Sequence, residues 1–97
     1  MTSKQRAFLR GLASTQEALL SIGKEGLTPE FTKSVDEART ARELIKISIQ
    51  KNCLEDPRQM ADILSERLRA EPVQVIGRKF VLYREGKDKK KKIELPR

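Results

Sequence analysis

The chain has 97 residues, a length that fits one small domain with a single modest core. It has no histidine and one cysteine, Cys53, which excludes Ser-His or Cys-His catalysis and an internal disulfide, so we expect neither an enzyme nor a cofactor. The net charge of +7 lies mostly in the last quarter, because residues 1–71 hold 12 Lys or Arg against 11 Asp or Glu whereas residues 72–97 hold 9 against 3, and this favours a polyanionic partner.

The first predicted element is a helix that Thr2 or Ser3 can cap and that runs to about Ala13. Its apolar stripe recurs at helical spacing and consists of Phe8, Leu9, Leu12 and Ala13. Residues 18–22 form a short apolar run that is typical of a buried strand. The start of the chain therefore predicts a helix followed by a strand.

A second helix is predicted to begin after Thr28, a strong N-cap, because Pro29 suits the first helical position, and to end near Ala41. Its expected buried positions are Phe31, Val35 and Ala38. Residues 43–50 then alternate, with three isoleucines pointing one way and polar side chains pointing the other. This alternation is typical of a half-buried strand.

Asp56 and Pro57 repeat the same signal of an N-cap followed by proline, which predicts a third helix that runs to about Ala70. The apolar positions that we expect to be buried on this helix are Met60, Ile63, Leu64 and Leu68. Two β-rich runs follow, residues 73–76 and 80–84, and the glycine-containing segment between them fits a short hairpin.

The resulting order α-β-α-β-α-β-β predicts an α/β fold with three helices and a mixed four-stranded sheet, because β-α-β crossovers give parallel pairs and a hairpin gives an antiparallel one. We expect this domain to span residues 1–85. Residues 86–97 are rich in lysine and have little to bury, so a flexible tail is expected there. No apolar run approaches about 18 residues, and the N-terminus lacks a signal-peptide core, which predicts a cytoplasmic protein that does not contact membranes.

The most informative motif is Gly23-Lys24-Glu25-Gly26, between the first predicted strand and the second predicted helix. Two glycines three apart let the backbone bend sharply and let a phosphodiester approach closely. The helix that follows offers unpaired N–H groups and the positive end of its dipole. A G-x-x-G loop clamps the nucleic-acid backbone in KH domains, although two turn glycines at the end of a strand also satisfy the pattern.

Four segments of the chain, in the same order, resemble the YhbY family of small bacterial RNA-binding proteins: residues 2–13, 22–28, 41–46 and 75–84. These proteins are stand-alone CRM domains (chloroplast RNA splicing and ribosome maturation). The resemblance implies a fold like the C-terminal domain of translation initiation factor three, RNA binding, and association with precursors of the large ribosomal subunit. It places the family's G-x-x-G on Gly23 and Gly26, and its basic positions on Lys24, Arg78 and Lys79.

The predicted RNA-binding residues are Gly23, Lys24, Glu25, Gly26, Thr28, Arg78, Lys79, Lys4, Arg6 and Arg10. Each group has an alternative. Glu25 puts a negative charge inside the loop, so its side chain either points away or weakens phosphate binding. The charges near residue 78 also suit an edge strand that must resist aggregation, and those of the first helix also suit the polar face of an amphipathic helix.

The favoured function is a monomeric protein that binds structured rRNA during large-subunit assembly, with no metal and no small-molecule substrate. Binding is expected to rest on backbone and shape rather than on base stacking, because Phe8 and Phe31 fit core positions and Tyr83 fits cross-strand packing. The alternative is a protein–protein adaptor that reaches ribosome precursors through a ribosomal protein. Binding to protein-free rRNA would separate the two functions.

Overall fold

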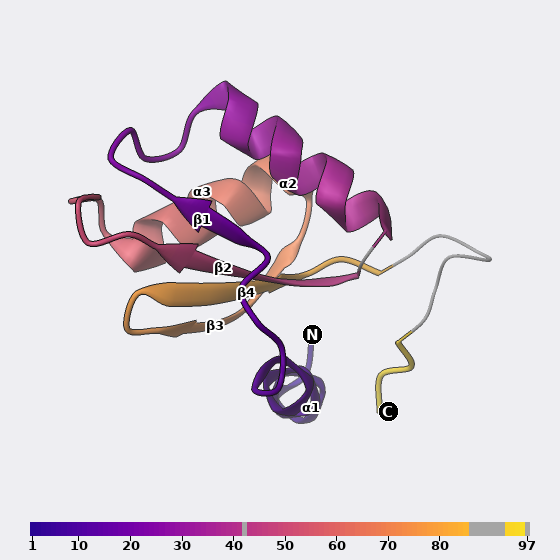
Figure 1. Cartoon of the computed structure of the whole chain (residues 1–97). Coiled ribbons are helices and arrows are strands. Elements are labelled where there is room, and N and C mark those ends of the chain that lie inside the picture. The colour runs from indigo at the N-terminus through magenta and orange to yellow at the C-terminus, as the bar shows by residue number, and fades with distance from the viewer. Residues whose placement is uncertain (42, 86–92, 97) are drawn as a thin grey trace.

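Seven elements form where the caps and apolar patterns predict them, and their order confirms the predicted α-β-α-β-α-β-β arrangement (Figure 1). The computed structural model describes residues 1–41, 43–85 and 93–96, without the side chains of residues 39–41. The elements are α1 (Ser3–Ala13), β1 (Leu20–Ile22), α2 (Pro29–Ala41), β2 (Leu44–Ile49), α3 (Pro57–Leu68), β3 (Glu71–Ile76) and β4 (Lys79–Tyr83). Among the described residues, no helix has the length and apolar character that a membrane span requires.

Side-chain caps set where α1 and α3 begin. At α1, the Thr2 hydroxyl accepts a hydrogen bond from the Gln5 amide (3.1 Å), and the Gln5 side chain accepts one from the Thr2 amide (3.0 Å), which makes a reciprocal capping box. At α3, the Asp56 carboxylate accepts a hydrogen bond from the Gln59 amide (3.0 Å), and Pro57 takes the first helical position. These bonds satisfy amides that the helices themselves leave unpaired.

The sheet is mixed, as predicted, and has the strand order β1-β2-β4-β3. Strand β1 pairs with β2 in parallel, and it covers only the last three of the predicted residues 18–22. Strand β4 lies between β2 and β3 and is antiparallel to both. The pairing of β3 with β4 is irregular between Pro72 and Gln74. Strands β1 and β3 are therefore the two edges of the sheet.

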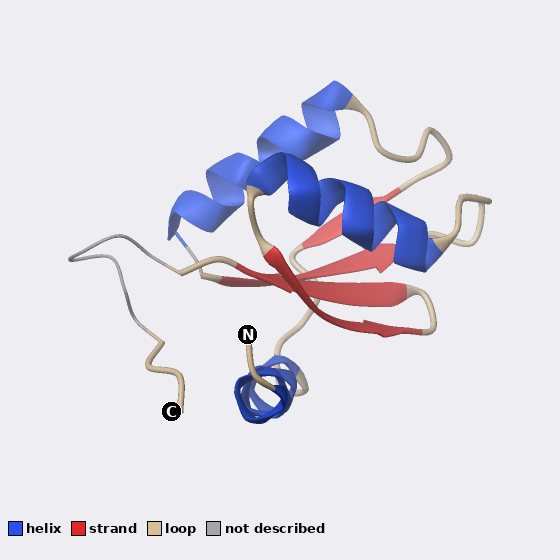
Figure 2. Cartoon of the chain, turned by 180° about the vertical axis from the view of Figure 1, so that it is seen from behind, coloured by secondary structure: helices blue, strands red, loops and turns tan. Residues whose placement is uncertain are grey.

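Both faces of the sheet are covered, by α2 and α3 on one side and by α1 on the other (Figures 1 and 2). The larger core, on the side of α2 and α3, consists of Ile22, Val35, Ile45, Ile47, Ile49, Cys53, Met60, Ala61, Leu64, Leu68, Phe80 and Leu82. The smaller core, on the side of α1, consists of Leu9, Ala13, Leu44, Val73, Val81 and Tyr83. Successive residues of the central strands therefore alternate between two cores.

Lys46 of β2 is a polar residue that the alternating pattern alone would place in water, yet it lies on the face of the sheet that α1 covers. Lys46 extends toward α1, and its ammonium group donates hydrogen bonds to the Ala13 and Gln16 carbonyls, both at 3.2 Å. Ala13 is the last residue of α1 and Gln16 lies in the turn after it, so the ammonium group is near the negative end of the helix dipole, which favours a positive charge. Lys46 thus fixes the end of α1 on the sheet.

Two apolar residues that were predicted to be buried are not. Phe8 on α1 and Ile63 on α3 are 41% and 43% exposed. Helix α1 touches the sheet through a narrow stripe one turn long, Leu9 and Ala13, and Phe8 lies beside that stripe. Ile63 similarly lies next to the buried face of α3. Tyr83, by contrast, is 4% exposed in the smaller core, which agrees with its predicted packing role.

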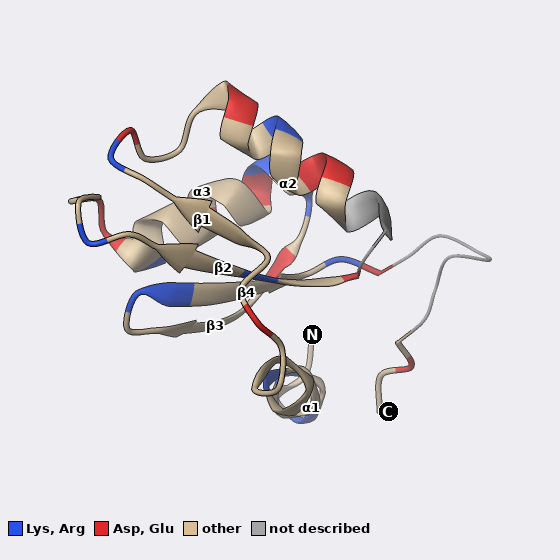
Figure 3. Ribbon diagram, in the orientation of Figure 1, with Lys and Arg blue, Asp and Glu red and all other residues tan. Residues whose placement is uncertain are grey.

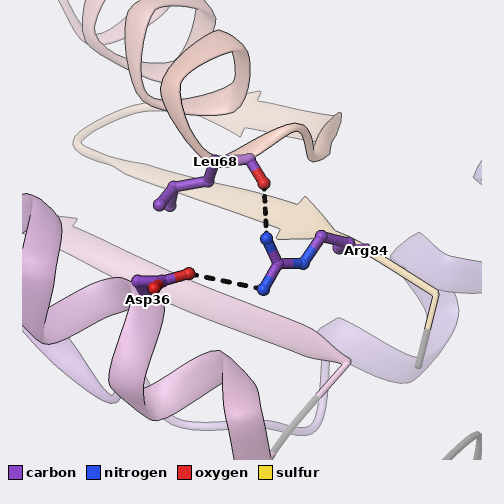
Figure 4. A network of polar contacts seen from close by, with 3 residues as sticks. All are labelled: Asp36, Leu68 and Arg84. Carbon is purple, nitrogen blue, oxygen red and sulfur yellow. Dashed lines mark hydrogen bonds and ion pairs between the residues drawn. The ribbon is translucent and has the colours of Figure 1, made fainter. Parts of the chain in front are cut away.

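Helix α3 ends two residues earlier than predicted, and a left-handed residue ends it. Arg69 has φ 54°, and the amide of Ala70 donates back to the Ser65 carbonyl at 2.8 Å. Arg84 then joins this end to α2, because its guanidinium donates to the Leu68 carbonyl (2.7 Å) and pairs with the Asp36 carboxylate (3.3 Å) (Figure 4). Arg84, in the segment after β4, thus connects α2 and α3.

Residues 93–96, which belong to the predicted tail, lie against the α1 side of the domain. Ile93 and Leu95 are half-buried and pack against the smaller core. The Ile93 amide donates to the Glu43 carboxylate (2.7 Å), and the Gln5 side chain donates to the Pro96 carbonyl (3.1 Å). The remainder of the predicted tail, residues 86–92 and 97, lies outside the described residues.

Replacing Ile93 and Leu95 together with serine is expected to lower the free energy of unfolding by about 1–2 kcal/mol, because each side chain loses part of the burial that stabilises it. Equilibrium unfolding in urea measures the change. The matched control is Glu94→Ser, at the exposed residue between them, and we expect it to stay within about 0.5 kcal/mol. Equal effects of the two variants would show that this segment contributes no packing.

Candidate nucleic-acid interface

Three loops meet at one end of the sheet: residues 23–28 after β1, residues 50–56 after β2, and the turn 77–78 between β3 and β4 (Figures 1 and 2). They meet because β1, β2 and β3 run in the same direction, since β2 and β3 are both antiparallel to β4. Backbone hydrogen bonds connect β1 to the second loop at 2.8 Å and β2 to the turn at 2.7 Å. We call this surface the loop end.

The G-x-x-G loop closes on itself, and only its second glycine has a left-handed backbone. The Gly26 amide donates to the Gly23 carbonyl at 3.0 Å. Gly26 has φ 70°, in the left-handed region, and a Cβ there would lie 2.5–2.7 Å from the Glu55 carboxylate. A Cβ on Gly23 would meet only the side chain of Gln50, at 3.4 Å. The loop shape therefore requires glycine at residue 26 more than at residue 23.

This loop presents backbone donors beside the start of α2. The amides of Lys24, Glu25 and Leu27 donate no hydrogen bond to any residue that the structure describes. Thr28 caps α2, because its hydroxyl accepts a hydrogen bond from the Phe31 amide at 3.0 Å. Unpaired amides next to the N-terminus of a helix form a site that suits an anion.

The charges around the loop are mixed (Figure 3). Lys24 and Glu25 are both exposed in the G-x-x-G loop. The loop after β2 adds Lys51, which is also exposed, and Glu55, whose carboxylate lies against Gly26. Sequence reasoning missed Lys51, although its position directly after a strand parallel to β1 would have placed it at the same end.

Arg78 is engaged by the protein itself. Its guanidinium donates to the carbonyls of Ile49 (3.2 Å), Gln50 (2.6 Å) and Cys53 (2.7 Å). The side chain therefore braces the hairpin against the loop after β2. Contact of Arg78 with RNA stays a prediction, and the structure shows that this side chain holds two of the three loops together.

Lys79, by contrast, is exposed, and its ammonium group makes no hydrogen bond or ion pair with the described part of the chain. It begins β4, which is a central strand, so the alternative role of protecting a sheet edge does not apply to it. The turn that precedes it has a positive φ at Gly77 (56°) only, the pattern of a type II′ hairpin turn. Lys79 thus joins the loop end as an available cation.

The three predicted residues of α1 lie elsewhere. Arg6 and Arg10 face β3, the edge of the sheet opposite β1, and Arg6 donates to the Pro72 carbonyl. Lys4 is exposed near the start of α1. The structure therefore brings Lys24, Thr28 and the hairpin together but places the α1 residues on a separate flank.

Comparisons with known proteins show which family the chain belongs to. Residues 1–84 match the family described as the CRS1 / YhbY (CRM) domain. A Bacillus subtilis protein named "Probable RNA-binding protein YqeI" is 43% identical over 96 residues, which cover 99% of each chain. A Haemophilus influenzae protein named "RNA-binding protein" is 32% identical over 97 residues, which cover all of this chain and 96% of that protein.

A solved structure shares the fold over the same length. The solution structure of SAV1595 from Staphylococcus aureus superposes with a TM-score of 0.84 at 43% identity, and the match covers 99% of both chains. The family match and the relatives cover the three loops, the two cores and nearly the whole chain. The chain belongs to the CRS1/YhbY (CRM) domain family.

Proposed function

We propose that this chain binds structured RNA through the loop end. The observation that carries the proposal is the G-x-x-G loop, closed by its own hydrogen bond and offering unpaired amides beside the start of α2. The names of the family's relatives support the same ligand class. Phosphate oxygens are acceptors only, so they match a surface of N–H donors.

Each residue at the loop end has a part in this binding. The amides of the loop donate hydrogen bonds to a phosphate, and Lys24 and Lys51 neutralise its charge from two neighbouring loops. Lys79 contacts the same RNA from the hairpin. Arg78 positions these groups by joining the hairpin to the loop after β2. Glu25 and Glu55 limit the affinity and disfavour indiscriminate binding of phosphates.

The fold supports recognition of backbone and shape rather than of stacked bases. Proteins that stack bases on a sheet leave aromatic side chains exposed on one open face. Here both faces are covered by helices, and the ring of Tyr83 is buried. No covalent chemistry is needed for this function.

We further propose that the RNA is large-subunit rRNA or its precursor, bound by a monomer in the cytoplasm during subunit assembly. The resemblance to the YhbY family supports this finer assignment. The test is competition between transcribed, protein-free 23S and 16S rRNA for the purified chain. We expect a preference for 23S rRNA, and equal binding of the two would contradict the assignment.

The same experiment tests the adaptor alternative, which one observation favours. Phe8 and Leu12 lie one turn apart on α1 and are both more than a third exposed, so α1 offers a small apolar surface to a protein partner. An adaptor would bind ribosome precursors but not protein-free rRNA. Binding of the free RNA would therefore exclude it as the main activity.

Replacing Lys24 with alanine is expected to weaken RNA binding and to lower the slope of log affinity against log salt by roughly 0.7–0.9, the value for one phosphate contact. The thermal midpoint should not change, because the ammonium group has no partner among the described residues. Titration with a transcribed RNA stem-loop at several salt concentrations measures both effects. Glu25→Gln, at the next residue, should raise the affinity, and Lys33→Ala, exposed on α2, is the control for net charge.

An unchanged affinity and slope for Lys24→Ala would remove Lys24 from the site. An equal loss for Lys33→Ala would show that the RNA responds to net charge and not to the loop.

A further inference from the structure

A cleft walled by arginines runs along the outer edge of β3. Its lining consists of Arg6, Arg10, Arg58 and residues 72–76. Arg6 and Arg10 come from α1 on one face of the sheet, and Arg58 comes from the start of α3 on the other. Strand β3 has no neighbouring strand on this side, so its outer backbone groups also face the cleft.

Two of the three guanidinium groups are available to a ligand. Arg6 donates to the Pro72 carbonyl and so fixes α1 against β3. The guanidinium groups of Arg10 and Arg58 make no hydrogen bond or ion pair with the residues that the structure describes. No acidic residue is part of the lining, whereas at the loop end carboxylates accompany the lysines. The cleft therefore has the more uniformly positive lining of the two surfaces.

The position of Arg58 is unfavourable for α3 itself. The N-terminal turn of a helix carries the positive end of the dipole, and a cation there opposes it by about 0.3–1 kcal/mol. The first turn of α3 contains no acidic residue, and Arg58 lies in it. The Asp56 carboxylate caps this end of α3, but the Arg58 guanidinium pairs with no carboxylate in the described fold, so an external anion would find an unpaired cation there.

We propose that the β3 cleft binds phosphate groups of the RNA backbone, as a second contact of the RNA that the loop end holds; this inference rests on the proposed function. The two surfaces are continuous. Ile76 lines the cleft and directly precedes the hairpin turn, and Arg58 follows the loop after β2 by two residues. An RNA strand that leaves the loop end around the hairpin thus enters the cleft.

Charge complementarity identifies the occupant. Guanidinium groups bind phosphate oxygens in pairs, and two free ones from opposite helices can grip successive phosphates. Protection of the β3 edge from aggregation would not require arginine from two layers, because Pro72 and the irregular pairing beside it already interrupt that edge. An acidic peptide is the competing ligand, and the experiment includes it.

The test is the double variant Arg10→Gln/Arg58→Gln, titrated with a short RNA stem-loop at several salt concentrations. We expect a loss of affinity of roughly tenfold and a salt slope lowered by roughly 1.4–1.8, the value for two phosphate contacts. The control is Arg67→Gln/Lys33→Gln, which removes the same charge from exposed positions on α3 and α2. Backbone amide shifts of residues 73–76 should respond to RNA in the wild type and not in the test variant.

Three results would overturn the proposal. Equal losses for the two double variants would show an effect of net charge alone. If the test variant keeps its affinity for RNA but self-associates, Arg10 and Arg58 protect the β3 edge from aggregation. Shifts of residues 73–76 with polyglutamate but not with RNA would assign the cleft to an acidic protein. If Lys24→Ala still weakens binding in these cases, RNA binding by the loop end is supported and only the role of the β3 cleft is excluded. A wild-type chain that binds no RNA would contradict both proposals.

Discussion

Replacing Arg78 with lysine is expected to lower the free energy of unfolding by about 1–3 kcal/mol. Three carbonyls lose a planar donor that reaches all of them at once, and an ammonium group cannot reproduce that geometry. The affinity for RNA should fall as well, because the hairpin and the loop after β2 are no longer held together. Urea unfolding and RNA titration of the same sample measure the two effects.

The neighbouring residue provides the matched control for this prediction. Lys79→Gln removes one charge at the same turn from a side chain with no partner in the described structure. It should weaken RNA binding and leave the stability within about 0.5 kcal/mol. If Arg78→Lys has the same stability as the wild type, the brace does not contribute to the fold.

Replacing Gly26 with alanine is expected to destabilise the domain by about 1–2 kcal/mol, the usual penalty of a left-handed backbone for a residue with a Cβ. The added methyl group must also displace the Glu55 carboxylate, which lies within 2.7 Å of its position. This change also displaces the amides of the G-x-x-G loop. RNA affinity should therefore fall by more than the increase in the unfolded fraction accounts for. Thermal unfolding and RNA titration check this.

The control for this variant is Gly11→Ala. Gly11 lies within α1, and a Cβ there would meet nothing within 4 Å. This change should stabilise the domain by about 0.5–1 kcal/mol, because glycine in a helix interior is unfavourable relative to alanine. A Gly26→Ala variant that also gained stability would contradict the requirement for glycine at this residue.

Local signals made the fold predictable. The starts of α2 and α3 are marked by an N-cap followed by proline, at Thr28-Pro29 and at Asp56-Pro57. The alternation of apolar and polar residues predicted strand β2. The structure confirms the number and order of the elements and the mixed sheet. It shortens α3, because no sequence pattern indicates that Arg69 takes a left-handed backbone.

The contacts between distant residues were not predictable from the same signals. The three acceptors of Arg78 lie 25–29 positions away, so its bracing role depends on how two loops meet in space. The exposure of Phe8 depends on how much of α1 the sheet can reach. Arg58 lines the β3 cleft because the start of α3 lies beside β3, and this placement depends on the tertiary fold.

The most direct test of RNA binding by the loop end is amide chemical-shift mapping of the intact chain with a stem-loop transcribed from 23S rRNA. We expect the largest shifts at residues 23–28, 50–56 and 77–79, which form one continuous surface. Shifts confined to the outer faces of α2 and α3, or the absence of any shift at an RNA concentration that saturates binding, would contradict the account.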